Sequence, residues 1–311
     1  MIKQMPDKMA LHVRNALISR RLPVLSTDEL SHIYDTIYEH LDCADDYCAK
    51  KVTWSKERAD IALAPYREAK ELSTSNQWAT VGMSATELAA LYLHANRISG
   101  MCPNEKIYAL ATAMSVAPIG DVVEIGTWWG KSALALLLLA RRYGIGNVLC
   151  VDPWKDDELV QGVPHVDEAS AALSAEEAFE VFKMNLLPYV NDKCADFSYL
   201  RGTSCAVRGL YNLMRPGTKL ARHSNDFGPV EYAGRIALLH IDGNHAYDKV
   251  AQDVALWTPL VVPGGWVVVD DYDWRHGDGP KRAADEYIAR AATQRHFVAG
   301  GAMFIQTGER E

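Results

Sequence analysis

The 311-residue sequence lacks any apolar run long enough to cross a membrane. Its longest uncharged apolar run, residues 133–140, is bounded by Lys131, Arg141 and Arg142, whereas a spanning helix needs about 20 apolar residues. Residues 1–15 carry charged side chains among the apolar ones and contain no signal-peptide core. We therefore expect a cytoplasmic protein with no membrane partner.

The sequence also lacks an excess of basic residues and any cysteine motif. Lys and Arg number 32 against 40 Asp and Glu, which gives a formal net charge of −8. Proteins that bind nucleic acid normally carry a basic excess, so we expect no nucleic-acid partner. The six cysteines show neither a CxxC pair nor the spacing of a disulfide framework, which is typical of free thiols in a reducing compartment. An acidic protein can instead attract a cationic ligand.

The first part of the chain, residues 1–118, has the pattern of helices. Apolar residues recur at helical spacing, and Ser84 with Glu87 and Ser26 with Glu29 fit the capping box at two helix starts. The apolar stripes of these helices need a surface to pack against. We expect them to be buried on the second part of the chain or on another subunit, in a dimer or tetramer.

From residue 121 short apolar runs alternate with amphipathic segments. The runs predicted as strands are 122–125, 147–151, 197–200, 236–241, 266–270 and two antiparallel strands joined by Gly300 and Gly301. Strands that alternate with helices predict an α/β fold, a doubly wound and mostly parallel sheet of seven strands. In such folds the ligand binds beyond the carboxyl ends of the strands.

The first strand leads into a loop with two glycines, residues 124–130. Gly126 and Gly130 allow a tight turn and a close approach of ligand to backbone. The dinucleotide fingerprint needs a glycine where Trp128 stands, which argues against a pyrophosphate and against the alternative function, a nucleotide-dependent oxidoreductase. Asp152 ends the second strand, where an acid commonly holds two ribose hydroxyls. A nucleoside ligand without a pyrophosphate, such as the cationic S-adenosylmethionine, fits this loop. The alternative is that the glycines only allow the helix to pack on the strand and that Asp152 only caps the following segment.

Three carboxylates stand at the ends of the fourth and fifth strands. Asp242 follows one strand, and Asp270 and Asp271 follow the next, so we expect them above one crevice. Like charges this close need a cation, a proton or water between them. An all-oxygen set favours Mg²⁺ or Ca²⁺, which can also bind vicinal hydroxyls of a substrate. The alternative is that Asp271 caps a turn and Asp242 positions water.

His245 lies three residues after Asp242 in a turn beside the crevice. An imidazole there suits a general base, since a hydroxyl must lose its proton as it attacks a methyl group. The alternative is that His245 caps the following helix. The predicted substrate contacts are the aromatic and acidic rim residues Trp154, Tyr247, Tyr272 and Asp273. They suit a polar ring that carries positive charge, such as an aminoglycoside, or else form a solvated surface.

Four motifs carry a family resemblance, and they lie at 124–132 (EIGTWWGKS), 151–154 (VDPW), 241–247 (IDGNHAY) and 263–273 (PGGWVVVDDYD). Together they resemble the class I S-adenosylmethionine-dependent methyltransferases, and more narrowly the macrocin O-methyltransferase-like group, which acts on sugar-bearing natural products. The match covers about 119–307. It implies a Rossmann-like catalytic domain at 119–311, with the N-terminal region as a lid or oligomer contact.

The resemblance also implies roles for individual residues. The cofactor-binding set is Glu124, Gly126, Thr127, Trp128, Gly130, Ser132, Asp152, Ser204 and Asp242. His245 and Asp242 are the catalytic pair, with Mg²⁺ held by the three carboxylates. The implied reaction moves a methyl group to a hydroxyl or amine of an antibiotic-type glycoside, and the choice between oxygen and nitrogen stays open. A non-catalytic relative would have no physical reason to keep His245 and the acids together.

Overall fold

The structure is a computed structural model and describes residues 45–75, 82–164, 167–168, 174–190, 195–218 and 223–309. The chain forms two compact units, Met1–Ala64 and Pro65–Glu311. Of the first unit the structure describes only part of helix α3 (Asp45–Ser75). No helix in the described ranges is both long and apolar enough to span a bilayer. The helix start predicted at Ser26 and Glu29 lies outside the described residues.

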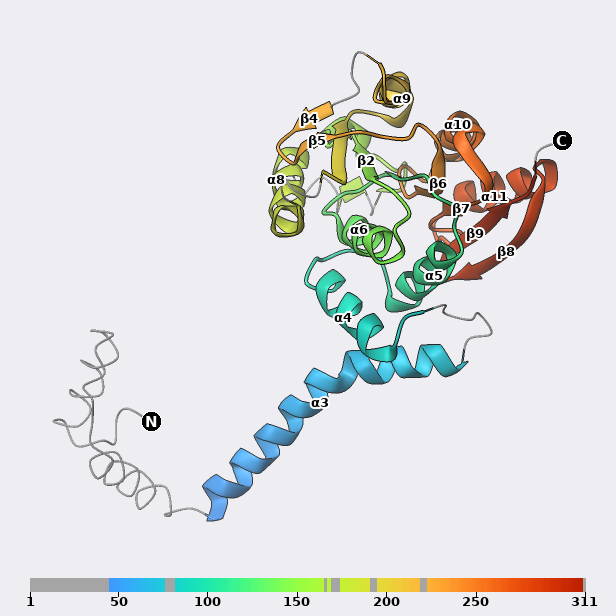
Figure 1. The fold of residues 1–311 in the computed structure, drawn as a ribbon. Coiled ribbons are helices and arrows are strands. Elements are labelled where there is room, and N and C mark those ends of the chain that lie inside the picture. The colour runs from blue at the N-terminus through green and yellow to red at the C-terminus, as the bar shows by residue number, and fades with distance from the viewer. Residues whose placement is uncertain are drawn as a thin grey trace. The chain divides into compact units, whose positions relative to one another are not determined.

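The second unit is built on a seven-stranded sheet with the order β3-β2-β1-β6-β7-β9-β8 (Figure 1). The strands are β1 (Asp121–Ile125), β2 (Val148–Asp152), β3 (Phe197–Arg201), β6 (Ile236–Ile241), β7 (Val261–Val269), β8 (Thr293–Ala299) and β9 (Ala302–Thr307). The first five pair in parallel, and β9 is antiparallel to both β7 and β8. The predicted doubly wound, mostly parallel sheet is confirmed.

Helices cover both faces of this sheet. One face carries α4 (Ala85–Ala95), α5 (Asn104–Ser115), α6 (Lys131–Tyr143) and α8 (Ala175–Leu186), and the other carries α9 (Ser204–Leu213), α10 (Tyr247–Trp257) and α11 (Gly279–Arg290). Val122 and Val123 show the reason: neighbouring strand residues point to opposite faces, and the two valines belong to different hydrophobic clusters. Every residue of β1, β2 and β6 is buried, so the central strands need apolar side chains on both sides.

Smaller elements complete the unit. A hairpin of β4 (His223–Asn225) and β5 (Gly228–Val230) lies beside β3. Three short 3-10 turns, η2 (Asp156–Glu158), η3 (Leu187–Tyr189) and η4 (Thr258–Leu260), follow β2, α8 and α10. The capping box predicted for α4 is present, because Ser84 Oγ accepts from the Glu87 amide while the Glu87 carboxylate accepts from the Ser84 amide.

The order of the strands reverses between β1 and β6, and their carboxyl ends define where a ligand binds. The two ends are in direct contact, since the Asp242 amide donates to the Ile125 carbonyl at 2.7 Å. Gly126 follows with φ +81°, and a Cβ there would lie 2.0 Å from the Asp242 carbonyl oxygen. Only glycine lets the loop after β1 pass so close to the end of β6.

Candidate active site

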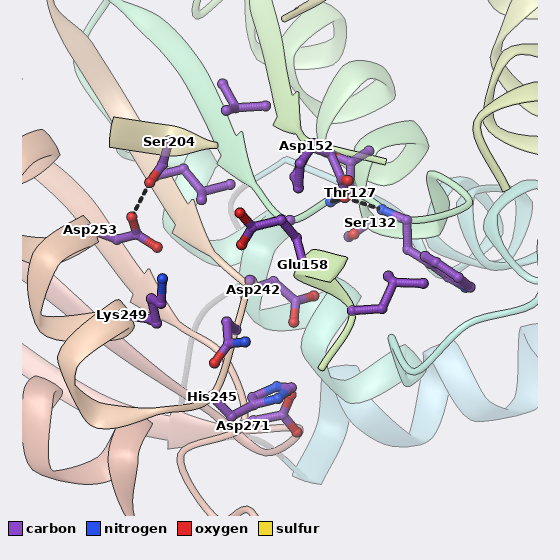
Figure 2. Close-up of a pocket in the computed structure, with 18 of the residues that line it drawn as sticks. Thr127, Ser132, Asp152, Glu158, Ser204, Asp242, His245, Lys249, Asp253 and Asp271 are labelled. Atoms are coloured by element: carbon purple, nitrogen blue, oxygen red, sulfur yellow. Dashed lines mark hydrogen bonds and ion pairs between the residues drawn. The ribbon is translucent and has the colours of Figure 1, made fainter. Parts of the chain in front are cut away.

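A cavity of about 840 Å³ opens at the carboxyl ends of β1, β2 and β6 (Figure 2). Ten of the residues predicted from the sequence line it: Gly126, Thr127, Trp128, Gly130, Ser132, Asp152, Ser204, Asp242, His245 and Asp271. These residues come from segments that are far apart in the chain. The topology of the sheet therefore brings most of the predicted site together.

The loop after β1 is held in shape by the carboxylate of Asp152. Oδ2 accepts from the amides of Thr127 and Trp128 at 2.8 and 3.0 Å, and Oδ1 accepts from the Trp154 amide at 2.7 Å. Burial raises the pKa of Asp152, while the three amides oppose that shift. A carboxylate has about four acceptor positions, so most of its capacity is used to hold the loop.

Gly130 of the same loop has to be glycine because α8 packs directly against it. Its φ is +88°, and a Cβ there would lie 2.5 Å from Leu186 Cδ2 and 3.0 Å from Phe182 Cδ2 on α8. The Gly130 amide also donates to the Thr127 carbonyl at 2.8 Å. The missing side chains of Gly126 and Gly130 thus face protein atoms, although both glycines line the cavity.

A second acid, Glu158, lines the same cavity from the segment after β2. It belongs to η2, and Figure 2 shows its carboxylate directed into the space between Ser204 and Asp242. Nothing in the sequence singles it out, because Asp156 and Asp157 precede it in what looks like a solvated acidic run. Glu158 has more free acceptor capacity toward a ligand than the buried Asp152.

Ser204 and Asp253 form another wall of the cavity. Ser204 Oγ donates to the carboxylate of Asp253, which is buried on α10 and lines the cavity beside Lys249 (Figure 2). Burial raises the pKa of Asp253 to about 6, although the Ser204 hydrogen bond opposes the shift. The sequence patterns missed Asp253; the only available signal was its spacing from Lys249, four residues along one helix face.

Glu124 requires a correction, because it does not line the cavity. Its side chain is fully buried and accepts from His240 Nδ1 at 3.0 Å. Burial alone would lower the pKa of His240, but hydrogen bonding to Asp270 and Glu124 outweighs it and raises the pKa to about 10. Strand alternation explains the placement: Glu124 points into the interior one residue before the chain turns toward the ligand.

The four predicted substrate contacts do not line this cavity. Trp154 is 1% exposed and packs against Phe179 and Phe182, with its indole N–H donating to the Trp128 carbonyl. None of the four predicted residues lines the pocket. Tyr247 and Tyr272 donate their hydroxyls to Glu286 and Asp285 of α11, and Asp273 is exposed.

Trp274 and His276 line the cavity on this side instead. Asp271 adopts a left-handed backbone with φ +53°, and the Trp274 amide donates to its carbonyl at 3.0 Å. This turn carries Trp274 over the crevice, where its ring stacks on His245 with centroids 4.6 Å apart. The sequence pattern cannot show which way a turn of this kind directs the chain.

His245 is fixed at both ring nitrogens. Nε2 lies 2.6 Å from Asp271 Oδ2, and Nδ1 lies 2.9 Å from Gln161 Oε1. The His245 amide also donates to Gln161 Oε1 at 2.9 Å, which makes that oxygen an acceptor and places the proton on Nδ1. Because a carboxylate oxygen only accepts, Nε2 is engaged by Asp271 in this arrangement, and it must leave that carboxylate before it can accept a proton as a general base.

The carboxylates of Asp242, Asp270 and Asp271 do not come together as one set of metal ligands. Asp270 turns inward, where it forms an ion pair with Lys106 and its Oδ2 lies 3.5 Å from His240 Nε2. Among the described residues, the sets with ligand atoms within 4.8 Å of one another are His240, Asp242 and Asp270, and Asp242, His245 and Asp271. Asp270 and Asp271 thus face different surroundings, so the predicted magnesium ligand set is not assembled.

Residues 123–272 match the family model described as a methyltransferase domain. This match extends over a little less than half of the chain. A curated relative, the 8-demethyl-8-(2,3-dimethoxy-alpha-L-rhamnosyl)-tetracenomycin-C 4'-O-methyltransferase of Streptomyces olivaceus, is 27% identical over 165 residues. The match covers 53% of this chain and 58% of the relative, so it spans little more than half the length of either protein.

Solved structures with a similar fold include CalS11, a TDP-rhamnose 3'-O-methyltransferase of calicheamicin biosynthesis, and the O-methyltransferase NovP. CalS11 is 14% identical with a TM-score of 0.43, covering 79% of this chain and 94% of that one. NovP is 18% identical with a TM-score of 0.41, covering 74% of this chain and 83% of that one. At these levels the assignment of the fold rests on the strand order described above.

Proposed function

We propose that the protein is an S-adenosylmethionine-dependent methyltransferase that methylates a sugar hydroxyl of a natural-product glycoside. The observation that carries the proposal is the cavity of about 840 Å³ in a methyltransferase domain, with a glycine loop at one side and the His245–Asp271 pair at the other. The curated relative is named for the methylation of a sugar oxygen, which favours oxygen over nitrogen. The cationic acceptor, the dimer or tetramer and the cytoplasmic location remain predictions from the sequence.

The cofactor is proposed to lie along the loop of residues 126–130. Asp152 would hold this loop through its three amides, while Glu158 would accept the ribose hydroxyls. Ser204 and Asp253 would lie near the adenine, where a buried acid can accept from an exocyclic amine. A cavity with several carboxyl groups suits a ligand whose sulfur is positively charged.

S-adenosylmethionine would supply the methyl group on a sulfonium centre, a good leaving group. His245 would accept the hydroxyl proton at Nε2 as the oxygen attacks the methyl carbon and the carbon–sulfur bond breaks. Gln161 keeps the other proton on Nδ1, and Asp271 stabilises the imidazolium that forms. In the complex, the acceptor hydroxyl would take the place at Nε2 that Asp271 now occupies, since such contacts rearrange when substrate binds.

A magnesium ion does not fit this scheme well. One candidate set, His240, Asp242 and Asp270, contains the carboxylate that is already paired with Lys106. The other set, Asp242, His245 and Asp271, includes a ring nitrogen of the proposed base. A metal on His245 would take the lone pair that the proton needs. The proposed reaction therefore contains no metal step.

The test is methyl transfer from labelled S-adenosylmethionine to a panel of rhamnosides, neutral glycosides and amino sugars, with products identified by mass spectrometry. We expect a methyl ether on a sugar. Methylation of amines alone would contradict the choice of oxygen, and the absence of transfer to every acceptor, together with no cofactor binding, would contradict the proposed function.

A further inference from the structure

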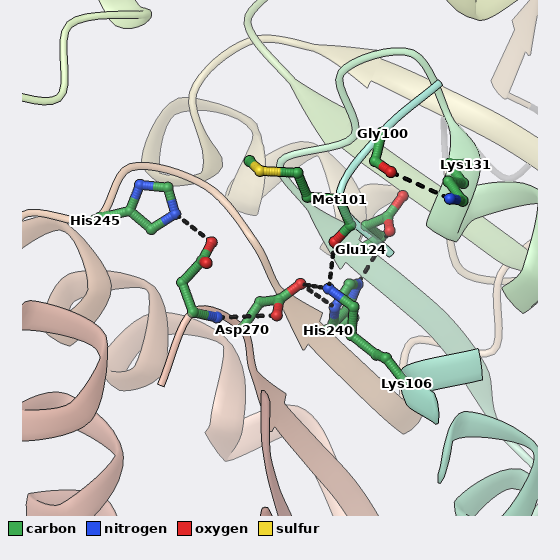
Figure 3. Close-up of polar contacts among 9 residues, drawn as sticks. Gly100, Met101, Lys106, Glu124, Lys131, His240, His245 and Asp270 are labelled. Carbon is green, nitrogen blue, oxygen red and sulfur yellow. Dashed lines mark hydrogen bonds and ion pairs between the residues drawn. The ribbon is translucent and has the colours of Figure 1, made fainter. Parts of the chain in front are cut away.

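A buried lysine contacts the acidic cluster from the helical region that precedes the sheet. Lys106 of α5 is 2% exposed, and its ammonium pairs with the Asp270 carboxylate and donates to the Met101 carbonyl at 3.0 Å (Figure 3). Met101 itself lines the cavity. Lys106 of α5 therefore contacts the segment before α5, which lines the cavity, although α5 itself does not line it.

Two of the three acids clustered here, Asp270 and Glu124, are paired with basic side chains, while the third, Asp242, lines the cavity. Lys106 faces Asp270, and His240 Nδ1 lies 3.0 Å from Glu124. All four side chains are at most 4% exposed. A buried carboxylate without a partner is costly, and here each of the two has a basic neighbour from the chain itself.

The same ion pair is connected to the proposed base. Asp270 Oδ1 accepts from the Asp271 amide at 2.9 Å, and Asp271 Oδ2 lies 2.6 Å from His245 Nε2. Asp271 has a positive φ of 53°, a left-handed backbone conformation that side-chain-bearing residues adopt less often than glycine. The hydrogen bond from its amide to the fixed Asp270 carboxylate holds that turn in place.

We propose that the Lys106 ammonium balances the charge of Asp270 in place of a divalent cation and, through Asp270, holds the turn at Asp271 that orients His245 before the acceptor binds, so that methyl transfer requires no added metal. This inference rests on the proposed function for its catalytic part only. Lys106 is a positioning residue, since it acts on the base through two other side chains. The charge-balancing part concerns the protein alone and can be tested without turnover.

The first measurement uses the purified protein and Mn²⁺ alone, followed by electron paramagnetic resonance. We expect the wild type to bind Mn²⁺ weakly and Lys106→Met to bind it about tenfold or more tightly, because Asp270 loses its cation. Lys106→Met/Asp270→Asn should lose that gain. Tight Mn²⁺ binding by the wild type that disappears in Asp270→Asn would overturn the proposal, and this result needs no variant of Lys106 to fold.

The second measurement compares methyl transfer in EDTA and in Mg²⁺. The wild type should keep its rate in both, whereas Lys106→Met should lose about 10- to 100-fold in kcat with little change in the KM for S-adenosylmethionine. Lys106→Arg, which keeps the charge, should recover part of kcat. Lys281→Met is the control, since Lys281 lies on the surface of α11 beside Asp285. Loss of wild-type activity in EDTA and its return with Mg²⁺ would overturn the proposal while leaving the proposed function intact.

Discussion

Single residues of the same chemical type have different tasks in this site, and their surroundings decide which. Asp152 accepts three backbone amides, while Glu158 on the neighbouring turn points into the cavity (Figure 2). Burial raises the pKa of Asp242, and the charge of Asp270 adds to that shift. Burial would also raise the pKa of Asp270, but the charge of Lys106 holds it well below its usual range. These contrasts lead to two predictions at the residue scale.

Asp152→Asn should weaken binding of S-adenosylhomocysteine and also lower the melting temperature. An amide nitrogen cannot accept from the loop amides, so at least one of the three bonds is lost at a cost of about 1–3 kcal/mol. Glu158→Gln should weaken binding by a similar factor without changing the melting temperature. Calorimetry and thermal denaturation of both variants check this. Equal melting temperatures for both variants would contradict the loop role of Asp152.

His245→Ala should leave the affinity for S-adenosylhomocysteine unchanged and lower kcat by about 10²- to 10⁴-fold, the range typical of a lost general base. The matched control is His296→Ala, since His296 is exposed on β8. Steady-state kinetics with the acceptor found in the panel supply the measurement. Full turnover by His245→Ala would remove the assignment of the base.

At the scale of elements, two junctions position the site: the contact between β1 and β6, and the face of α10 that reaches the cavity. Gly126 is the point of contact between the strand ends.

Gly126→Ala should destabilise the protein by about 3 kcal/mol or more, because the new methyl group meets a backbone carbonyl. Gly144→Ala is the control, because Gly144 has φ +64° but no atom within 4 Å of the place that a Cβ would take, and it should cost about 1 kcal/mol. Urea denaturation compares the two.

The α10 junction predicts a pH dependence. The pKa of Asp253 is raised to about 6 in the folded protein, above its ordinary value near 3.8. The folded state therefore binds this proton more tightly, and the free energy of unfolding falls as pH rises from about 4 to 6, by at most about 3 kcal/mol. Asp253→Asn should be more stable than the wild type at pH 7.5, and the difference should shrink at pH 4.5. An equal difference at both pH values in urea denaturation would contradict the shift.

At the scale of the whole molecule, the sheet could be predicted from the sequence because strand alternation and helix periodicity are local patterns. The positions of Asp242 and His245 followed from topology, since parallel strands end at one edge of the sheet. Lys106 and Asp253 could not be found this way, because they reach the site only through helix packing on the sheet. The prediction that Trp154 contacts the substrate has a different difficulty. Its position after β2 is as predicted, but its side chain packs against Phe179 and Phe182 of α8.

The most direct test of the account is calorimetric titration of the wild-type protein with S-adenosylhomocysteine, first in EDTA and then in Mg²⁺. The account predicts micromolar binding in EDTA, because Glu158, the loop of residues 126–130 and Asp253 form the cofactor site without a metal. It also predicts no gain in affinity when Mg²⁺ is added. Absence of binding in both buffers would contradict the assignment as a methyltransferase.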